Sequence, residues 1–159
     1  MSMTDYQASV VDEKTFVVTR SIHIAAPVEK VWRAITEPAQ ISRWFGRAEF
    51  DGSGAGANGT LTWPDRRPVP VRIEAIDEPR TVSYRWSNDD ASGSEPSEVD
   101  DATSTVFTFS LEPLDDGTRL TVVETGFDVT SDPAANLESH RQGWNAELDK
   151  LVALLEGDA

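Results

Sequence analysis

The chain has 159 residues, which is enough for one domain with a sizeable hydrophobic core. Its 28 acidic and 14 basic side chains give a formal net charge of −14, which disfavours nucleic acid and anionic lipid surfaces as partners. The absence of cysteine excludes disulfide frameworks and thiol chemistry, and no apolar run approaches a membrane span of roughly 18 residues, so we expect a cytoplasmic protein without membrane insertion.

The N-terminal part is expected to begin with a flexible lead-in over residues 1–14, because this stretch is polar and acidic. The following segment, FVVTRSIHI, alternates in polarity and predicts a half-buried strand. Its apolar face carries Phe16, Val18, Ile22 and Ile24, and Arg20 is the one polar side chain on that face.

Two short helices are predicted next. Pro27 is suited to the first position of a helix, and apolar residues follow at helical spacing. Glu37-Pro38 ends this helix, because proline disfavours the helical conformation of its predecessor. A second short helix should then place Ile41, Trp44 and Phe45 on one side. Such a bent pair suits the end of a sheet better than its face.

The region from Arg47 to Trp86 is predicted to form strands separated by turns. Apolar and polar residues alternate over residues 60–63, 69–75 and 82–86, the pattern of antiparallel strands with one face in solvent. Residues 88–104 differ, with six acidic residues, no basic ones and no aromatics. We expect a mobile loop there, serving either as an acidic lid or docking segment or as an insertion without function.

The segment VFTFSLEPLDDGTRLTVVETGF predicts a hairpin with its turn at Asp115-Asp116-Gly117. If Leu111 faces Leu120, then Phe109 faces Val122 and Phe107 faces Glu124. One face of the hairpin therefore carries apolar residues and, at its far end, a carboxylate.

The C-terminal segment predicts a helix from Pro133 to Glu156, with Asp132 as N-cap and Gly157 as a stop. Gly143, inside this helix, either allows close packing against the sheet or leaves room for a ligand. The apolar stripe is long enough to cover a sheet and consists of Leu137, Trp144, Leu148, Leu151 and Leu155. The order of elements indicates an α+β domain.

Two stretches, RSIHIAAPVEKVWRAITEPAQISRWFG and LEPLDDGTRLTVVETGF, followed by a long helix containing Gly143-Trp144, resemble the SRPBCC (START-like, helix-grip) superfamily. Within it, the chain resembles the branch named after the C-terminal domain of the activator of Hsp90 ATPase. The resemblance implies a single domain over residues 15–157, with a curved antiparallel sheet of about seven strands wrapped around the C-terminal helix. It also implies a cavity between helix and sheet.

The leading hypothesis is a binding module for a small hydrophobic molecule of lipid, polyketide or aromatic type. A buried Glu124 would need a partner, for which Arg20, His140 and Arg141 are the candidates. Residues expected to line or border the cavity come from the strands, the second short helix and the closing helix: Trp44, Trp63, Val71, Ile73, Trp86, Phe107, Phe109, Val122, Glu124, His140, Trp144 and Leu148.

Two other hypotheses stay open. A polyketide cyclase or aromatase would use Glu124 or His140 as an acid–base group, although the sequence contains no recognisable set of catalytic residues. A chaperone cofactor would use the acidic loop to bind a protein partner, and a homodimer is also compatible with the sequence. Neither histidine has a second ligand at metal-binding spacing, and no nucleotide-binding glycine motif occurs, so we expect no metal and no cofactor.

Overall fold

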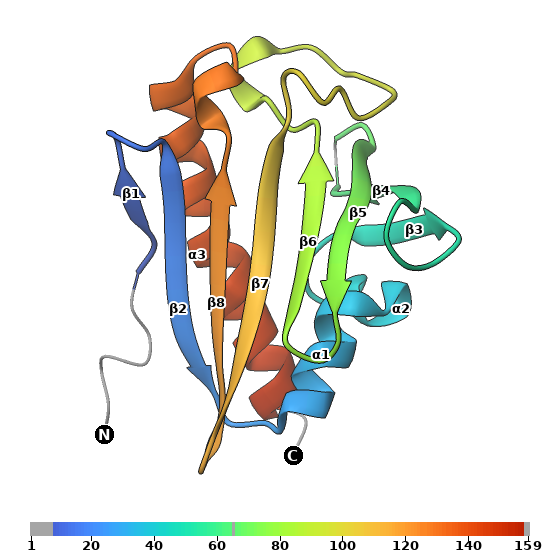
Figure 1. The fold of residues 1–159 in the computed structure, drawn as a ribbon, viewed down its shortest axis with the longest axis vertical. Coiled ribbons are helices and arrows are strands. Elements are labelled where there is room, and N and C mark those ends of the chain that lie inside the picture. The colour runs from blue at the N-terminus through green and yellow to red at the C-terminus, as the bar shows by residue number, and fades with distance from the viewer. Residues whose placement is uncertain (1–7, 65, 158–159) are drawn as a thin grey trace.

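An antiparallel sheet and one long helix across its face form the body of the molecule (Figure 1). The computed structural model describes residues 8–64 and 66–157, and within them the sheet has eight strands in the order β1-β2-β8-β7-β6-β5-β4-β3. This arrangement confirms the predicted α+β helix-grip class, with eight strands in place of about seven. The strands are β1 (Val10–Asp12), β2 (Val17–Ile24), β3 (Arg47–Asp51), β4 (Asn58–Thr62), β5 (Val69–Asp77), β6 (Thr81–Trp86), β7 (Thr105–Leu114) and β8 (Gly117–Thr125).

The helices pack on the inner face and one end of the sheet. The long helix is α3 (Pro133–Gly157), the short pair is α1 (Val28–Thr36) and α2 (Pro38–Ile41), and two 3-10 turns are η2 (Asp90–Ser92) and η3 (Phe127–Val129). The predicted second helix is shorter than expected, because α2 ends at Ile41. Trp44 and Phe45 follow it in a turn but are still buried, so the predicted apolar side is kept.

The expected lead-in needs a correction over its described part. Val10–Asp12 forms β1, which pairs with β2 in the register Val10↔Thr19. Without β1, the strand β2 would lie at the edge of the sheet with unpaired backbone N–H and C=O groups, and β1 pairs with these groups. The residue before β1 is also held in place, because the side chain of Asn145 in α3 accepts hydrogen bonds from the backbone N–H and hydroxyl of Ser9. Residues 1–7 lie outside the described residues.

The hairpin of β7 and β8 has the predicted register: Leu111 pairs with Leu120, Phe109 with Val122 and Phe107 with Glu124. Alternation fails at one place in β5, where the register shifts between Ile73 and Ala75. Beyond this bulge the inner and outer positions exchange, so Ala75 is exposed and not on the inner face as predicted.

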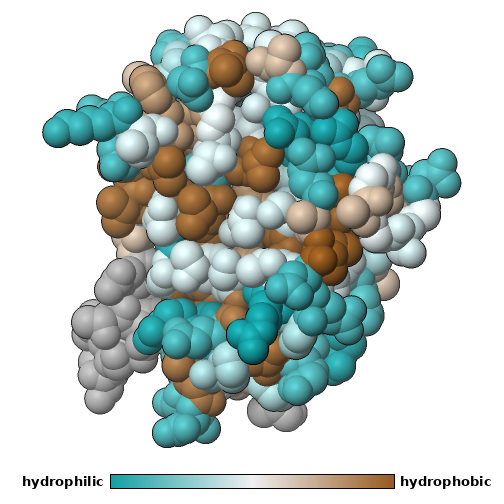
Figure 2. Space-filling view, in the orientation of Figure 1, coloured by the Kyte–Doolittle hydropathy of each residue, from teal (hydrophilic) through white to brown (hydrophobic). Residues whose placement is uncertain are grey.

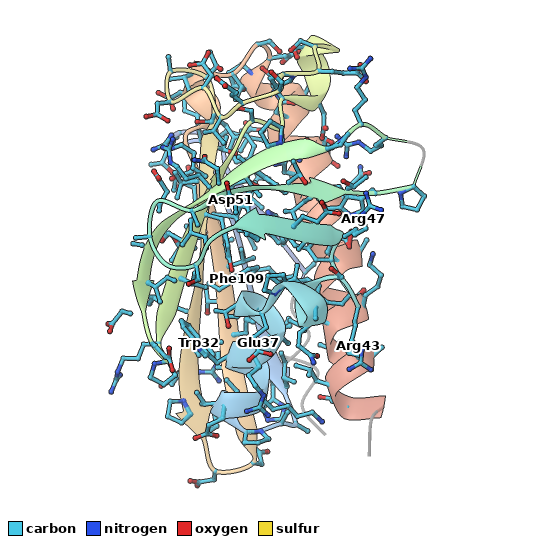
Figure 3. The ribbon with its side chains drawn as sticks, turned by 90° about the vertical axis from the view of Figure 1, so that its right-hand side faces the viewer. Trp32, Glu37, Arg43, Arg47, Asp51 and Phe109 are labelled. Atoms are coloured by element: carbon cyan, nitrogen blue, oxygen red, sulfur yellow. The ribbon has the colours of Figure 1, made fainter. Side chains whose placement is uncertain are left out.

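Helix α3 buries the predicted stripe against the sheet, with Leu148 and Leu151 fully covered. Asp132 caps its start by accepting a hydrogen bond from the backbone N–H of Ala135. In the side view, Phe109 lies in the interior, whereas Arg43 and Arg47 lie on the outside beside α3 (Figure 3). The opposite face of the sheet shows hydrophilic residues with separate hydrophobic groups between them, as expected of a solvent-facing surface (Figure 2).

Candidate functional site

The side chain of Glu124, at the end of β8, points under α3 and has no exposed surface. Its Oε2 accepts hydrogen bonds from Trp86 Nε1 at 2.8 Å and Thr105 Oγ1 at 2.5 Å. Its Oε1 accepts from Trp144 Nε1 at 2.8 Å and lies 2.8 Å from His140 Nδ1. Four donors, one each from β6 and β7 and two from α3, therefore surround this carboxylate, so this buried charge is paired.

His140 is the ionic partner of Glu124. Burial alone would lower the pKa of His140, but the charge of Glu124 and hydrogen bonds to Asp90 and Glu124 outweigh it and raise this pKa to about 10. The ring is therefore an imidazolium at neutral pH, donating from Nδ1 to Glu124 and from Nε2 to the carbonyl oxygen of Asn88 at 3.0 Å. Burial raises the pKa of Glu124, but the same pairing outweighs it and the pKa is lowered.

The other two candidate partners of Glu124 are engaged elsewhere. Arg20 is buried and donates to the carbonyl oxygens of Trp144 and Asn145 and to the carboxylate of Asp149 at 2.8 Å. It therefore joins β2 to α3, which explains a cation on the apolar face of the strand. Arg141 pairs with Glu138 on the outside of α3.

Aromatic rings fill most of the space between α3 and the sheet. Phe45 is central, with ring centroids of Trp44, Trp86, Phe107 and Trp144 at 4.9 to 6.0 Å. The space left among these inner residues near α1 has a volume of only about 10 Å³. In this part of the molecule, the protein's own side chains therefore occupy the cavity that the resemblance implied between helix and sheet.

An open pocket lies instead at the edge of this core, where α3 passes the ends of β4 and β6. We call it the tryptophan pocket. Its volume is about 260 Å³, and it is lined by Phe45, Trp63, Arg66, Trp86, Asn88, Asp90, Ser139, His140, Gly143, Trp144 and Glu147.

Four of the twelve predicted cavity residues line the tryptophan pocket, namely Trp63, Trp86, His140 and Trp144. The other eight do not, because they are packed in the core: Trp44, Val71, Ile73, Phe107, Phe109, Val122, Glu124 and Leu148. All of these twelve residues except Trp63 are buried, but buried residues become pocket walls only where packing leaves a gap.

Gly143 is one of the residues that line the pocket. A Cβ atom placed on it would meet no atom within 4 Å. Close packing against the sheet therefore does not explain this glycine, although in mid-helix it costs about 1 kcal/mol relative to alanine. The second of the two sequence-based interpretations, room beside Trp144, agrees with the geometry.

Polar groups stand at the rim of the pocket. Glu147 Oε1 accepts from Trp63 Nε1 at 3.0 Å, and Lys150 Nζ lies 2.6 Å from Glu147 Oε2. On the opposite side, Asp90 accepts from Ser139 Oγ at 2.7 Å.

The acidic loop, residues 88–104, is more ordered at its start than predicted. It contains η2, and Asp89 accepts hydrogen bonds from the backbone N–H and hydroxyl of Ser131 and from Asn136 Nδ2, each at 2.7 Å. Burial raises the pKa of Asp89, but these hydrogen bonds outweigh it and lower the pKa. The loop is thus attached to the N-terminal turn of α3, a contact that an acidic composition alone does not reveal.

Sequence reasoning missed several lining residues. Ser139 and Glu147 lie four residues before and after Gly143 on one face of α3, so helical spacing from that glycine was a usable signal. Arg66, Asn88 and Asp90 come from turns whose positions depend on the whole fold. Phe45 was expected on the apolar side of the second short helix, and the turn directs its ring into the core.

Among residues 8–64 and 66–157, no group of three or more histidine, aspartate or glutamate side chains is placed to hold a metal ion. None of the helices in this part of the chain is long and apolar enough to cross a membrane.

A family model described as Activator of Hsp90 ATPase homolog 1-like protein matches residues 25–156. Protein MLL2253 from Mesorhizobium loti is similar in structure, with a TM-score of 0.74 and 26% identity over 90% of this chain and 98% of that one. CalU16 from Micromonospora echinospora has a TM-score of 0.68 and 22% identity over 95% of this chain and 72% of its own.

DynU16, from the dynemicin biosynthetic locus, has a TM-score of 0.69 and 22% identity over 88% of this chain and 47% of its own. At 22% identity, the likenesses to CalU16 and DynU16 establish a shared fold. No curated protein matches the chain.

Proposed function

The chain belongs to the family of Activator of Hsp90 ATPase homolog 1-like proteins, and from this premise we propose that it binds a small, mostly apolar molecule in the tryptophan pocket. The observation that carries the proposal is an open space of about 260 Å³ lined by three tryptophans, one phenylalanine and a glycine of the long helix. Ligand pockets typically measure about 300–1,000 Å³, so the enclosed part of the ligand is small.

The walls favour a flat, apolar ligand. Trp86 and Trp144 are stacked at 6.0 Å with an interplanar angle of 28°, and Trp63 lies 6.2 Å from Trp86. Both Trp86 and Trp144 are held in place by their N–H groups on Glu124. The buried carboxylate thus orients two walls of the pocket, and an aromatic or polyketide ring system would meet preformed surfaces.

The geometry supports binding more than acid–base catalysis. Glu124 does not line the pocket, and its oxygens are occupied by four donors. His140 lines the pocket, but both of its nitrogens are engaged by Glu124 and Asn88. A general acid or base must reach the proton that it transfers, and these two groups face each other instead.

The test is titration of the protein with a panel of naphthalene, coumarin, isoprenoid alcohol and fatty acid probes, followed by calorimetry and tryptophan fluorescence. We expect at least one ring-containing probe to quench the fluorescence. Gly143→Leu should weaken the binding of that probe at least about tenfold, because the new side chain takes up space in the pocket. Ala146→Leu, at an exposed position of the same helix outside the pocket, is the matched control and should leave binding unchanged.

If no probe binds at its solubility limit, or if Gly143→Leu and Ala146→Leu have equal effects, the proposal is wrong. In the first case a protein-interaction role becomes the better account.

A further inference from the structure

A second hollow of about 300 Å³ adjoins the tryptophan pocket. We call it the loop hollow, and Arg66, Arg67, Asn88, Asp89, Ser94 and Glu95 are among the residues that line it. The two spaces share Arg66, Asn88 and Asp90 as wall residues. The β4–β5 turn and the acidic loop, which carry these residues, meet at the upper end of the sheet (Figure 1).

One of these shared residues, Arg66, contacts the other two. Arg66 Nη2 donates to Asn88 Oδ1 at 3.1 Å and to Asp90 Oδ1 at 3.3 Å, and its guanidinium lies 5.6 Å from the centroid of the Trp63 ring. The side chain of Arg66 is 46% exposed and that of Asp90 is 30% exposed. Ion pairs at this exposure shift an equilibrium by less than about fivefold, so Arg66 can leave this position at small cost.

We propose that Arg66 is a displaceable partition within one continuous site, and that the ligand is an elongated molecule. Its apolar ring system lies in the tryptophan pocket, and its neutral, hydroxyl-rich end lies in the loop hollow. This inference rests on the proposed function and adds the length and polarity of the ligand to it.

The charges of the loop hollow determine the polarity of that end. Three carboxylates, those of Asp89, Asp90 and Glu95, face two guanidinium groups, those of Arg66 and Arg67, and Arg67 is already paired with Glu95 at 2.8 Å. A carboxylate end would meet an excess of negative charge in a protein of net charge −14. A hydroxyl group both donates and accepts, so it can bond to either kind of wall group without a net charge.

The experiment uses three coumarin probes that share one ring system. They are 7-methoxy-4-methylcoumarin, 4-methylumbelliferyl β-D-glucoside and 4-methylumbelliferyl β-D-glucuronide, and their dissociation constants are measured by calorimetry on the full chain. We expect the glucoside to bind at least about threefold more tightly than the methoxycoumarin, since each added hydrogen bond contributes about that much. The glucuronide, with a carboxylate on the sugar, should bind more weakly than the glucoside.

Two variants locate the sugar. Arg66→Ala should strengthen binding of the glucoside by about two- to fivefold, because the sugar no longer has to displace the partition. Ser94→Phe, in the exposed wall of the loop hollow, should weaken the glucoside alone. Arg119→Ala is the matched control, because Arg119 is also 46% exposed, is paired with a carboxylate and lines neither space.

Equal binding of glucoside and methoxycoumarin to the wild-type protein would overturn the inference and leave the proposed function standing. Weaker glucoside binding by Arg66→Ala would also overturn it, because Arg66 would then be a ligand contact. Absence of binding by all three probes would overturn the inference, whereas the proposed function is decided by the wider probe panel.

Discussion

Glu124 shows how one residue can organise a site that it does not line. Its carboxylate holds the indole N–H groups of Trp86 and Trp144 and the imidazolium of His140 in a region without solvent. Removing the carboxylate alone should destabilise the fold strongly, because the buried donors would lose their acceptor in a region that water does not reach.

We therefore predict that Glu124→Gln lowers the free energy of unfolding by about 3 kcal/mol, the lower end for a buried pair that loses one member. The amide group would also place N–H donors against the donors that face Glu124. Urea unfolding followed by circular dichroism measures the change. Glu112→Gln on the neighbouring strand, where the carboxylate is exposed and 3.4 Å from Arg119, should change stability by less than about 0.5 kcal/mol. Equal effects of the two substitutions would show that the buried network contributes no more to the free energy of unfolding than an exposed ion pair does.

Gly143 gives a prediction of opposite sign. Because a Cβ at this position meets no atom within 4 Å, Gly143→Ala should stabilise the protein by about 0.5–1 kcal/mol through helix propensity. Thermal unfolding measures the gain. A loss of stability would mean that the helix approaches its neighbours more closely than the structure shows, and would restore the packing explanation for this glycine.

At the scale of elements, the attachment of the acidic loop to α3 depends on Asp89, which receives three hydrogen bonds from Ser131 and Asn136. The carboxylate lies at the N-terminal turn of the helix, where negative charge and side-chain acceptors are favourable.

We predict that Asp89→Ala costs about 1 kcal/mol, the usual net contribution of a hydrogen bond, and increases amide hydrogen exchange over residues 88–94 and at the start of α3. Hydrogen exchange by mass spectrometry provides the measurement. Glu98→Ala, an exposed acidic change in the same loop, is the control for charge alone and should leave exchange in both segments unaltered. If exchange is unchanged in Asp89→Ala, the loop is held by other contacts.

Elements with strong periodicity were predictable from the sequence. The register of β7 and β8 and the stripe of α3 follow from alternation and helical spacing, because burial of one face leaves few alternatives. Three features did not follow. The strand β1 depends on a free sheet edge, the end of α2 at Ile41 depends on how Trp44 and Phe45 pack, and the order of the acidic loop depends on Asp89 reaching a distant helix.

The candidate site was predictable only in part, for a related reason. The pairing of Glu124 with His140 was among three stated possibilities, and four of the pocket walls were named. The position of the pocket depends on how Phe45, Phe107 and Phe109 fill the interior. Such packing depends on all of the contacting residues together, so the residue spacing within one segment does not predict it.

On the scale of the whole molecule, the titrating groups predict how stability varies with pH. The pKa of His140 is raised from 6.5 to about 10, so its contribution is fully present below pH 6.5 and is lost as pH rises toward 10. The pKa values of Glu124, Asp89 and Asp90 are lowered from 4.5, 3.8 and 3.8, so their contributions are present above those values and are lost in acid. Stability should therefore be highest between about pH 5 and 6.5.

The alkaline side isolates His140, provided that the measurements stop at pH 9. Tyr84 is buried and its pKa is raised, so ionisation of this residue in the unfolded chain adds a second loss only near pH 10 and above. Between pH 6.5 and 9 we expect the free energy of unfolding to fall by up to about 1.4 kcal/mol per pH unit, the limit for one proton. His140→Gln should remove this slope, whatever its effect on absolute stability. His23→Gln, which changes the other histidine on the outer face of β2, should retain the slope. Urea unfolding at several pH values gives both slopes. A slope that persists in His140→Gln would assign the alkaline loss to other groups that titrate in this range and not to the buried pair of His140 and Glu124.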